Sequence, residues 1–304
     1  MNKQPIKNKT AETKLSIIIL NYNTKDLLKQ CLSSFVQKDN YQVIVVDNAS
    51  IDSSVEMVKK EFPRVEIIQS KQNLGFTKGN NLARDHATGK YVLFLNSDTK
   101  LQANTLPVML DFMESDPTVG ISTCLTLLPS GKLYYACHRG FPTLWNSFCY
   151  FSGLAKIFSK SQLFAGYTAT YLPVDKIHEI DACSGTFLLI RKELLDKIGW
   201  FDEDYFAYGE DIEMCYRVKE LRFKVMFNPS AIIYHYWGAS SGLKSTSRDV
   251  TTASVSNRNR WNKARYEAMR IFFEKHYRQK YPEIFRYLVL AAIKAVMYLR
   301  ASVD

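Results

Sequence analysis

Several short motifs that would assign a protein to a common class are missing from this sequence. It contains no Gly-x-Gly-x-x-Gly and no Walker-A segment, so a dinucleotide-dependent dehydrogenase and a P-loop NTPase are disfavoured. Its six cysteines form no Cys-x-x-Cys pair and show none of the short spacings of a zinc site. We therefore expect buried free thiols, as in a protein made in a reducing compartment.

Long hydrophobic runs are missing as well. The first apolar run covers only residues 16–20 and follows a polar, lysine-rich start, so we expect no signal peptide. A later apolar stretch, 287–299, is 13 residues long, whereas a membrane-spanning helix needs roughly 20. The chain nevertheless has 304 residues, 46% of them hydrophobic, which is enough to bury a core and excludes a disordered or low-complexity protein.

The net charge of +10 is concentrated at the two ends of the chain. Residues 1–14 hold four lysines and one glutamate, and residues 244–304 hold thirteen Lys and Arg against five Asp and Glu. The ends therefore contribute +3 and +8, and the body between them is close to neutral. A basic tail indicates a nucleic acid or an anionic membrane surface as a partner. Because no nucleic-acid-binding motif accompanies the charge, we expect no nucleic acid.

The first hundred residues alternate between strand-like and helix-like patterns. β-Branched or apolar runs predict strands at 15–20, 41–46, 65–68 and 91–95. Between them, apolar spacing and capping residues predict helices at 25–37, after Asp52 or Ser53 and at 77–86. Either Asp52 or Ser53 can cap the second of these helices, and Ser53 with Glu56 fits a capping box. This alternation predicts an α/β fold with a mostly parallel central sheet flanked by helices.

The second half is less regular. We expect a helix at 101–114, strands at 119–127, 186–190 and 231–234, and a helix at 192–198. The stretch 139–173 is aromatic and loop-like, which suggests an insertion that faces a substrate or a partner. Residues 244–260 are expected to be flexible, and two helices should finish the chain.

Each predicted strand of the first half ends in a polar cluster. Asn21, Asp47, Asn73 and Asp98 follow the four apolar runs. Because ligands in such sheets bind beyond the carboxyl ends of the strands, these side chains predict one common site.

Six segments, in this order, carry a resemblance to a known family. They are Leu-Asn-Tyr-Asn (20–23), Val-Val-Asp-Asn-Ala-Ser (45–50), Asn-Leu-Gly-Phe (73–76), Leu-Asn-Ser-Asp (95–98), the acidic and aromatic run 201–211, and His-Tyr-Trp-Gly (235–238). The chain resembles family-two inverting glycosyltransferases of the GT-A fold, in the bacterial rhamnosyltransferase-like branch. The match covers about residues 14–240. It implies a basic arm at 1–13, a GT-A domain at 14–243 and a basic helical extension at 244–304.

The resemblance implies a nucleotide-diphosphate sugar as donor. A turn carboxylate such as Asp47 can accept a hydrogen bond from the N3–H of uracil or thymine, which favours a pyrimidine nucleotide; its alternative role is that of an ordinary turn aspartate. The resemblance places Asn21 beside the same nucleotide and Asn73, Lys78 and Asn81 along its ribose and phosphates. For Lys78 a solvated helix lysine is an equal alternative. The branch favours dTDP-rhamnose, and a UDP-sugar is also possible.

A divalent cation, Mg²⁺ or Mn²⁺, is the expected cofactor. The segment Asn96-Ser-Asp98 stands where the family carries Asp-x-Asp, so Asp98 alone supplies a carboxylate to a cation that bridges two phosphates. Asn96 is left to hold ribose or water. By resemblance His235 is the second ligand, and a carboxylate with an imidazole suits Mn²⁺ as readily as Mg²⁺.

The acidic pair Glu210-Asp211 is the candidate for proton abstraction. Inversion by direct displacement needs one base and no covalent nucleophile. The family motif assigns the base to Asp211, while Glu210 either raises the proton affinity of Asp211 or binds the acceptor. The structural alternative is two acids that stabilise a helix N-terminus. Gly185 and Trp237 are the expected contacts of the acceptor, a glycan or a lipid-linked sugar.

The basic tail leaves two interpretations open. Its short apolar helix, surrounded by Lys and Arg, fits a peripheral helix pair on the anionic inner face of the cell membrane. Equally, the helices can pack back onto the catalytic domain.

Two other functions are less favoured. A nucleotidyltransferase would need a glycine-rich basic loop after the first strand, which residues 21–24 do not provide. A non-catalytic, membrane-docked relic should have lost the acid at 98 or at 211. We therefore predict a cytoplasmic glycosyltransferase of cell-surface polysaccharide assembly.

Overall fold

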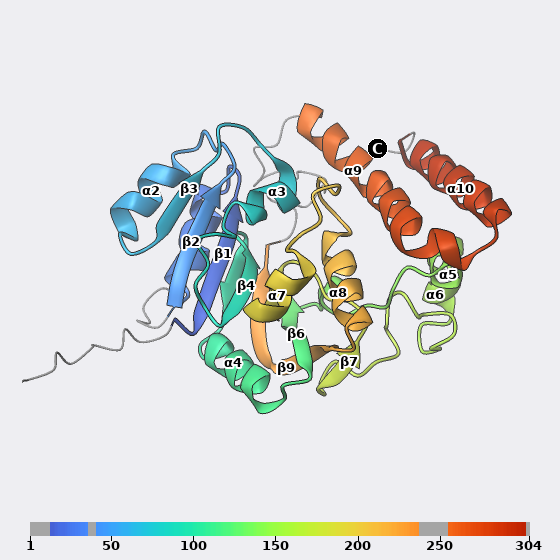
Figure 1. Ribbon diagram of the computed structural model, residues 1–304, viewed down its shortest axis with the longest axis horizontal. Coiled ribbons are helices and arrows are strands. Elements are labelled where there is room, and N and C mark those ends of the chain that lie inside the picture. Colours follow the sequence, from blue (N-terminus) through green and yellow to red (C-terminus); the bar gives the residue numbers. More distant parts are fainter. Residues whose placement is uncertain (1–12, 36–40, 237–254, 302–304) are drawn as a thin grey trace, which may run out of the picture.

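The computed structural model describes residues 13–35, 41–236 and 255–301, in which one β-sheet is covered by helices on both faces (Figure 1). The strands are β1 (Leu15–Asn21), β2 (Tyr41–Asp47), β3 (Glu66–Gln69), β4 (Tyr91–Asn96), β5 (Thr99–Leu101), β6 (Val119–Leu127), β7 (His178–Ile180), β8 (Phe187–Arg191) and β9 (Lys224–His235). The helices are α1 (Lys25–Ser33), α2 (Ser54–Glu61), α3 (Gly75–Asn81), α4 (Thr105–Ser115), α5 (Leu144–Ser152), α6 (Leu154–Ile157), α7 (Lys192–Ile198), α8 (Glu210–Glu220), α9 (Val255–Phe272) and α10 (Glu283–Ala301).

The sheet has the strand order β3-β2-β1-β4-β8-β6-β9-β5, and β7 pairs with β9. The first four strands in this order are parallel, and β6 is parallel to β9. Strand β8 is antiparallel to its two neighbours, and β5 and β7 are antiparallel to β9. The α/β class is confirmed, but the sheet is mixed, because the strand–helix alternation that forces parallel pairing ends after β4.

Alternating side chains of the central strands divide between two cores. Ile17 and Ile19 of β1 belong to the core under α1, α2 and α4, whereas Ile18 belongs to the core that α7, α8 and α9 cover. Strands buried on both faces read as continuous apolar runs, and this is why they were predictable from sequence. In-register pairing of β1 with β2 places Asn21 opposite Asp47 at the carboxyl ends.

Several predicted boundaries differ from the structure. Helix α3 ends at Asn81, well before the predicted 86, because Gly79 and two asparagines are weak helix formers. The predicted helix 101–114 is preceded by the short strand β5 and starts at Thr105. Strand β9 is twelve residues long and extends far beyond the predicted 231–234.

The predicted capping box before α2 is wrong. Ser53 has a φ of +60° and makes no capping hydrogen bond with its side chain. At the start of α2 the side chain of Asp52, the other predicted cap, accepts a hydrogen bond at Oδ1 from the Ser54 backbone N–H (3.1 Å). Its Oδ2 accepts from the backbone N–H of Lys25, the first residue of α1 (2.8 Å).

The C-terminal helix α9 packs against the sheet-covering layer. Ala268, Phe272 and Phe273 are buried in the same core as Met214 and Cys215 of α8. Residues 255–260, which were expected to be flexible, belong to this helix; 244–254 lie outside the described residues. Of the two interpretations of the tail, packing onto the catalytic domain therefore holds for α9.

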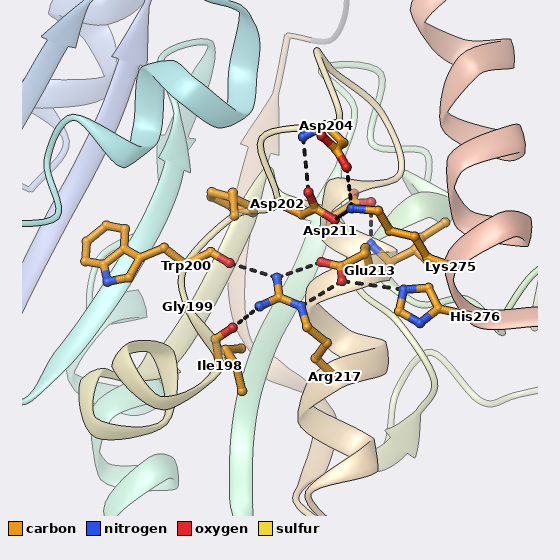
Figure 2. A network of polar contacts seen from close by, with 12 residues as sticks. Ile198, Gly199, Trp200, Asp202, Asp204, Asp211, Glu213, Arg217, Lys275 and His276 are labelled. Atoms are coloured by element: carbon orange, nitrogen blue, oxygen red, sulfur yellow. Dashed lines mark hydrogen bonds and ion pairs between the residues drawn. The ribbon is translucent and has the colours of Figure 1, made fainter.

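Polar contacts reinforce this packing (Figure 2). Lys275, in the π-helical turn that follows α9, lies 2.5 Å from Asp202 and 2.6 Å from Asp204. On α8, Arg217 forms a bidentate pair with Glu213 (2.7 and 2.6 Å) and donates to the backbone carbonyls of residues 198 and 200. The loop between α7 and α8 is thus held between α8 and the C-terminal extension.

Two expectations about the whole chain can be compared with the structure. The six cysteines are buried free thiols, as predicted. Within the described residues, every helix is too short or too polar to cross a membrane.

Candidate functional site

A cavity of about 1120 Å³ lies beyond the carboxyl ends of β1, β2 and β4. Asp98 and His235 line it, and so do Glu210 and Asp211 at the start of α8. Further lining residues come from α5, α9 and α10. The sheet, the insertion between β6 and β7, and the C-terminal helices therefore all contribute to one cavity.

Asp98 and His235 form a close, buried pair in this cavity. The Nε2 atom of His235 lies 3.1 Å from Oδ1 of Asp98, and their side chains are 2% and 6% exposed. Antiparallel pairing of β5 with β9 sets Thr99 opposite His235, and the Tyr236 N–H donates to the Asp98 carbonyl (2.8 Å). The Nδ1 atom of His235 is buried and has no hydrogen-bond partner. Backbone pairing thus brings together two residues that are far apart in sequence.

Asp211 is held by three donors. Its Oδ2 accepts from Nη2 of Arg139 (2.5 Å) and from the backbone N–H of Gly185 (3.1 Å), and its Oδ1 accepts from the N–H of Ile212 (2.7 Å). Arg139 also donates to the carbonyl of Cys183 (3.1 Å). Burial opposes the charge of the guanidinium, but Asp211 and the nearby phenols outweigh it and raise the pKa of Arg139.

Glu210 differs sharply from its neighbour. It is buried and lines the cavity, and its Oε2 has no hydrogen-bond partner. Burial, followed by the negative charge of Asp211, raises the pKa of Glu210 to about 8. The raised pKa favours the protonated form of the Glu210 carboxyl, which can donate a hydrogen bond into the cavity.

The turns before α8 and α3 depend on two glycines. Gly209 has a φ of +80°, and a Cβ there would lie 3.2 Å from that of Ala268 on α9. Gly75 has a φ of +84°, and a Cβ there would lie 2.5 Å from the carbonyl oxygen of Phe206. The close approach lets the Phe76 N–H donate to that same carbonyl (2.7 Å). This hydrogen bond joins the loop after β3 to the loop that precedes Glu210 and Asp211.

A polar network fills the carboxyl ends of β1 and β2. Asn21 donates to Oδ1 of Asp47 (3.0 Å) and to Oγ of Ser50 (3.0 Å), while Oδ2 of Asp47 accepts from the Ser50 N–H (2.9 Å). Thr24 links this network to the turn after β4 through Ser97, with 2.9 Å between their hydroxyl oxygens. Each Asp47 oxygen retains a second lone pair for another donor.

The comparisons with known proteins agree with this geometry. The family described as Glycosyl transferase family 2 matches residues 16–199. The chain belongs to glycosyltransferase family 2.

This glycosyltransferase is similar in sequence to two rhamnosyltransferases. It is 26% identical over 231 residues to rhamnosyltransferase WbbL of Escherichia coli, covering 72% of this chain and 82% of that one. It is 23% identical over 241 residues to the N-acetylglucosaminyl-diphospho-decaprenol L-rhamnosyltransferase of Mycobacterium tuberculosis, covering 75% and 78%.

Two solved structures share the fold. Mannosyltransferase PcManGT of Pyrobaculum calidifontis, in complex with GDP-Man and Mn²⁺, gives a TM-score of 0.57 at 19% identity over 95% of this chain and 71% of that one. Residues 1–349 of Staphylococcus aureus TarS, in complex with UDP-GlcNAc, give 0.55 at 20% identity over 92% and 71%. The GT-A-like fold expected for the glycosyltransferase is confirmed.

The structure brings most of the predicted site residues to the cavity of the glycosyltransferase. Those that line it are Asn73, Asn96, Asp98, Gly185, Glu210, Asp211 and His235. Asn21 and Asp47 do not line the cavity and are buried in the polar network at the strand ends. Gly185 reaches the site through its backbone N–H, which holds Asp211.

Of the predicted residues that the structure describes, Lys78 and Asn81 also do not line the cavity. Lys78 is exposed on α3. Asn81 forms reciprocal hydrogen bonds with the backbone of Phe201 (2.9 and 3.1 Å), so its amide is used to hold the loop after α7. Trp237 lies outside the described residues.

The sequence analysis missed two residues of the site. Arg139 was passed over because nothing near it in sequence is acidic. Asn48 bridges to Asn73 (3.1 Å) and to the Leu74 N–H (2.8 Å), and joins the loop after β3 to the end of β2. Its position directly after Asp47, at a strand end, was an available signal.

Proposed function

We propose that this family-two glycosyltransferase inverts the anomeric centre as it transfers a sugar from a pyrimidine nucleotide diphosphate to a glycan or lipid-linked acceptor. The observation that carries the proposal is that the Glu210–Asp211 pair and the Asp98–His235 pair line the same cavity. The Glu210–Asp211 pair supplies the base for the acceptor, and the Asp98–His235 pair holds the diphosphate of the donor. The product belongs to cell-surface polysaccharide assembly, in keeping with the names of the rhamnosyltransferase relatives.

Asp47 and Asn21 recognise the nucleotide base in this proposal. The hydrogen bond from Asn21 orients the Asp47 carboxylate and leaves lone pairs that accept the N3–H of uracil or thymine. Cytosine has no proton at N3, so a uridine or thymidine nucleotide is preferred. The rhamnosyltransferase relatives favour dTDP-rhamnose, with a UDP-sugar as the alternative donor.

Asp98 and His235 fit a divalent cation that arrives with the donor. They offer a carboxylate and an imidazole 3.1 Å apart, and within the described part of the chain no third acidic, histidine or cysteine side chain completes a cluster. Two protein ligands suit Mg²⁺ or Mn²⁺, which take their remaining ligands from phosphates and water. When bound, the cation would offset the charge that develops on the leaving diphosphate.

Asp211 acts as the base. It takes the proton of the acceptor hydroxyl as that oxygen bonds to the anomeric carbon and the bond from this carbon to the diphosphate oxygen breaks. Arg139 and the Gly185 N–H fix the direction in which the carboxylate points. Protonated Glu210 donates a hydrogen bond to a sugar hydroxyl in the cavity.

The surface of the C-terminal helices supports a peripheral place at an anionic membrane. Ile284 and Tyr287 on α10 are each about 60% exposed (62% and 63%) on a segment rich in Lys and Arg. Exposed apolar side chains next to cations suit an interfacial helix. We propose that α10, rather than α9, makes this contact.

The proposed function is tested with a donor screen that measures released dTDP, UDP or GDP, with and without Mn²⁺. We expect release from a dTDP- or UDP-sugar, dependent on the metal, and loss of the metal response in Asp98→Ala together with weaker donor binding. A protein equally active in EDTA would remove the metal from the proposal. Release of GDP alone would contradict the role of Asp47.

A further inference from the structure

Two sets of side chains line the cavity, and we call them its polar end and its apolar end. The polar end is formed by the acidic pair and the Asp98–His235 pair. The apolar end is formed by α10, which lines the cavity with Phe285, Leu288, Val289, Ala292, Ile293 and Val296. These positions recur at helical spacing and so form one stripe along a single face of α10.

The core of the protein covers only part of this stripe. Val289 packs against the core, whereas Leu288 is 58% exposed and Phe285 is 43% exposed. Phe148 and Phe151 of α5 line the same cavity and are 56% and 39% exposed. An exposed apolar surface of this kind, continuous with a reaction site, indicates a bound apolar group.

Both ends belong to one cavity, so a ligand at the apolar end can extend to the acidic pair. At about 1120 Å³ the cavity exceeds the range of roughly 300–1000 Å³ that is common for small-molecule sites. A nucleotide sugar carries only small apolar groups, such as a base ring or a methyl, and no hydrocarbon chain that would extend along the α10 stripe. A long apolar group would therefore come with the acceptor.

A cation also lines the cavity. Arg265 on α9 lines the cavity, with its guanidinium carbon 5.3 Å from the centre of the Tyr208 ring. Within the described ranges no carboxylate lies at ion-pair distance from Arg265. Its charge is therefore available to an anionic ligand, and a phosphate is the group that an arginine binds best.

We propose that the apolar end of the cavity binds the hydrocarbon chain of an acceptor lipid, with the phosphate head of that lipid beside Arg265. This inference rests on the proposed glycosyltransfer, and it assigns α10 and α5 as the chain-binding walls. A flexible, linear chain fits a stripe that runs along a helix better than a compact apolar ligand does.

The test measures binding of farnesyl diphosphate, a short isoprenoid with a diphosphate head, by isothermal titration calorimetry. The variants are Ala292→Trp, which fills the apolar end, and Ala291→Trp, its matched control. Both alanines are exposed on α10, but only Ala292 lines the cavity. Inorganic diphosphate serves as the chain-free ligand, and release of nucleotide from the donor is measured in the same preparations.

We expect wild type and Ala291→Trp to bind farnesyl diphosphate alike, and Ala292→Trp to bind it at least about tenfold more weakly. Inorganic diphosphate should bind more weakly than farnesyl diphosphate. The inference is overturned if the wild type does not bind the probe, if both variants lose the same affinity, if Ala292→Trp loses none, or if inorganic diphosphate binds as well. Donor turnover without probe binding refutes the lipid site alone, whereas probe binding without turnover refutes the proposed function.

Discussion

Arg139 and Asp211 form an ion pair with 2.5 Å between Nη2 and Oδ2, and their side chains are only 15% and 10% exposed. Arg139 comes from the irregular stretch after β6, whereas Asp211 lies in the first turn of α8. The proposed base is thus positioned by a residue 72 positions earlier in the chain. The insertion between β6 and β7 consequently contributes a residue to the proposed catalytic site.

Arg139→Ala should lower kcat far more than it changes donor binding. Without the guanidinium, the Asp211 carboxylate loses a donor that fixes its direction, and removing one partner of a buried pair typically costs about 3–5 kcal/mol of stability. We expect guanidinium ion to restore part of kcat, because it can enter the vacated space. Two results together would contradict the positioning role. They are that guanidinium ion does not restore the kcat of Arg139→Ala, and that Arg139→Lys is as active as wild type.

Asp211→Asn should remove most turnover while donor binding stays nearly unchanged. Proton abstraction by a positioned base contributes roughly 10²–10⁴-fold to rate. Steady-state rates at saturating acceptor and the Kd for the donor nucleotide measure the two effects separately. Glu220→Gln, at the exposed far end of the same helix, is the matched control. If Asp211→Asn retains the wild-type rate, Asp211 is a helix-stabilising acid and not the base.

Glu210→Gln should stabilise the protein increasingly as the pH rises. The pKa of Glu210 is about 8 in the folded state, against 4.5 for an ordinary glutamate. Between these values the folded state holds a proton that the unfolded state has released, so this group lowers stability as the pH rises. Glutamine removes the titration but keeps a hydrogen-bond donor.

Thermal denaturation from pH 5 to pH 9 measures this effect. The difference in Tm between Glu210→Gln and wild type should be small near pH 5, grow towards pH 8 and level off above it. Glu220→Gln should show no such trend. A Tm difference that stays constant over the whole range would mean that Glu210 ionises normally.

The full-length protein should bind anionic vesicles better than neutral ones. Each Lys or Arg near an anionic surface contributes about 1 kcal/mol, and the attraction is screened by salt. Co-sedimentation with vesicles at low and high ionic strength measures the binding. Tyr287→Asp, on the exposed part of α10 that does not line the cavity, should weaken it without loss of donor binding. Equal binding to both kinds of vesicle would mean that the basic charge of the tail does not bind anionic lipids and has another role.

Much of the fold follows from local pattern. Buried parallel strands produce the uninterrupted apolar runs at 15–20 and 91–95, and each strand must stop where a polar cluster begins. That is why the α/β class and the placement of Asp98 at a strand end could be predicted. The motif around Glu210 and Asp211 marked the start of α8 for the same reason, since acids favour a helix N-terminus.

The partners of these residues were decided by tertiary structure. The local sequence pattern predicts the strand, helix or loop on which a side chain lies. It does not predict which distant segments of the backbone pack beside that side chain. Asn81 was predicted to contact ribose, but its side-chain amide forms hydrogen bonds with the backbone of the loop after α7. Arg139 looked like a loop residue, and only the path of the insertion brings it to Asp211.

The apolar residues of the C-terminal extension show the same division. Their periodicity identifies helices and an apolar stripe, and the sequence alone determines that much. Whether such a stripe meets a core, a membrane or a cavity depends on where the helix docks. Here the inner face of α9 is buried against α8 while that of α10 lines the cavity, because the π-helical turn at Phe273–Tyr277 and the residues after it reverse the chain direction.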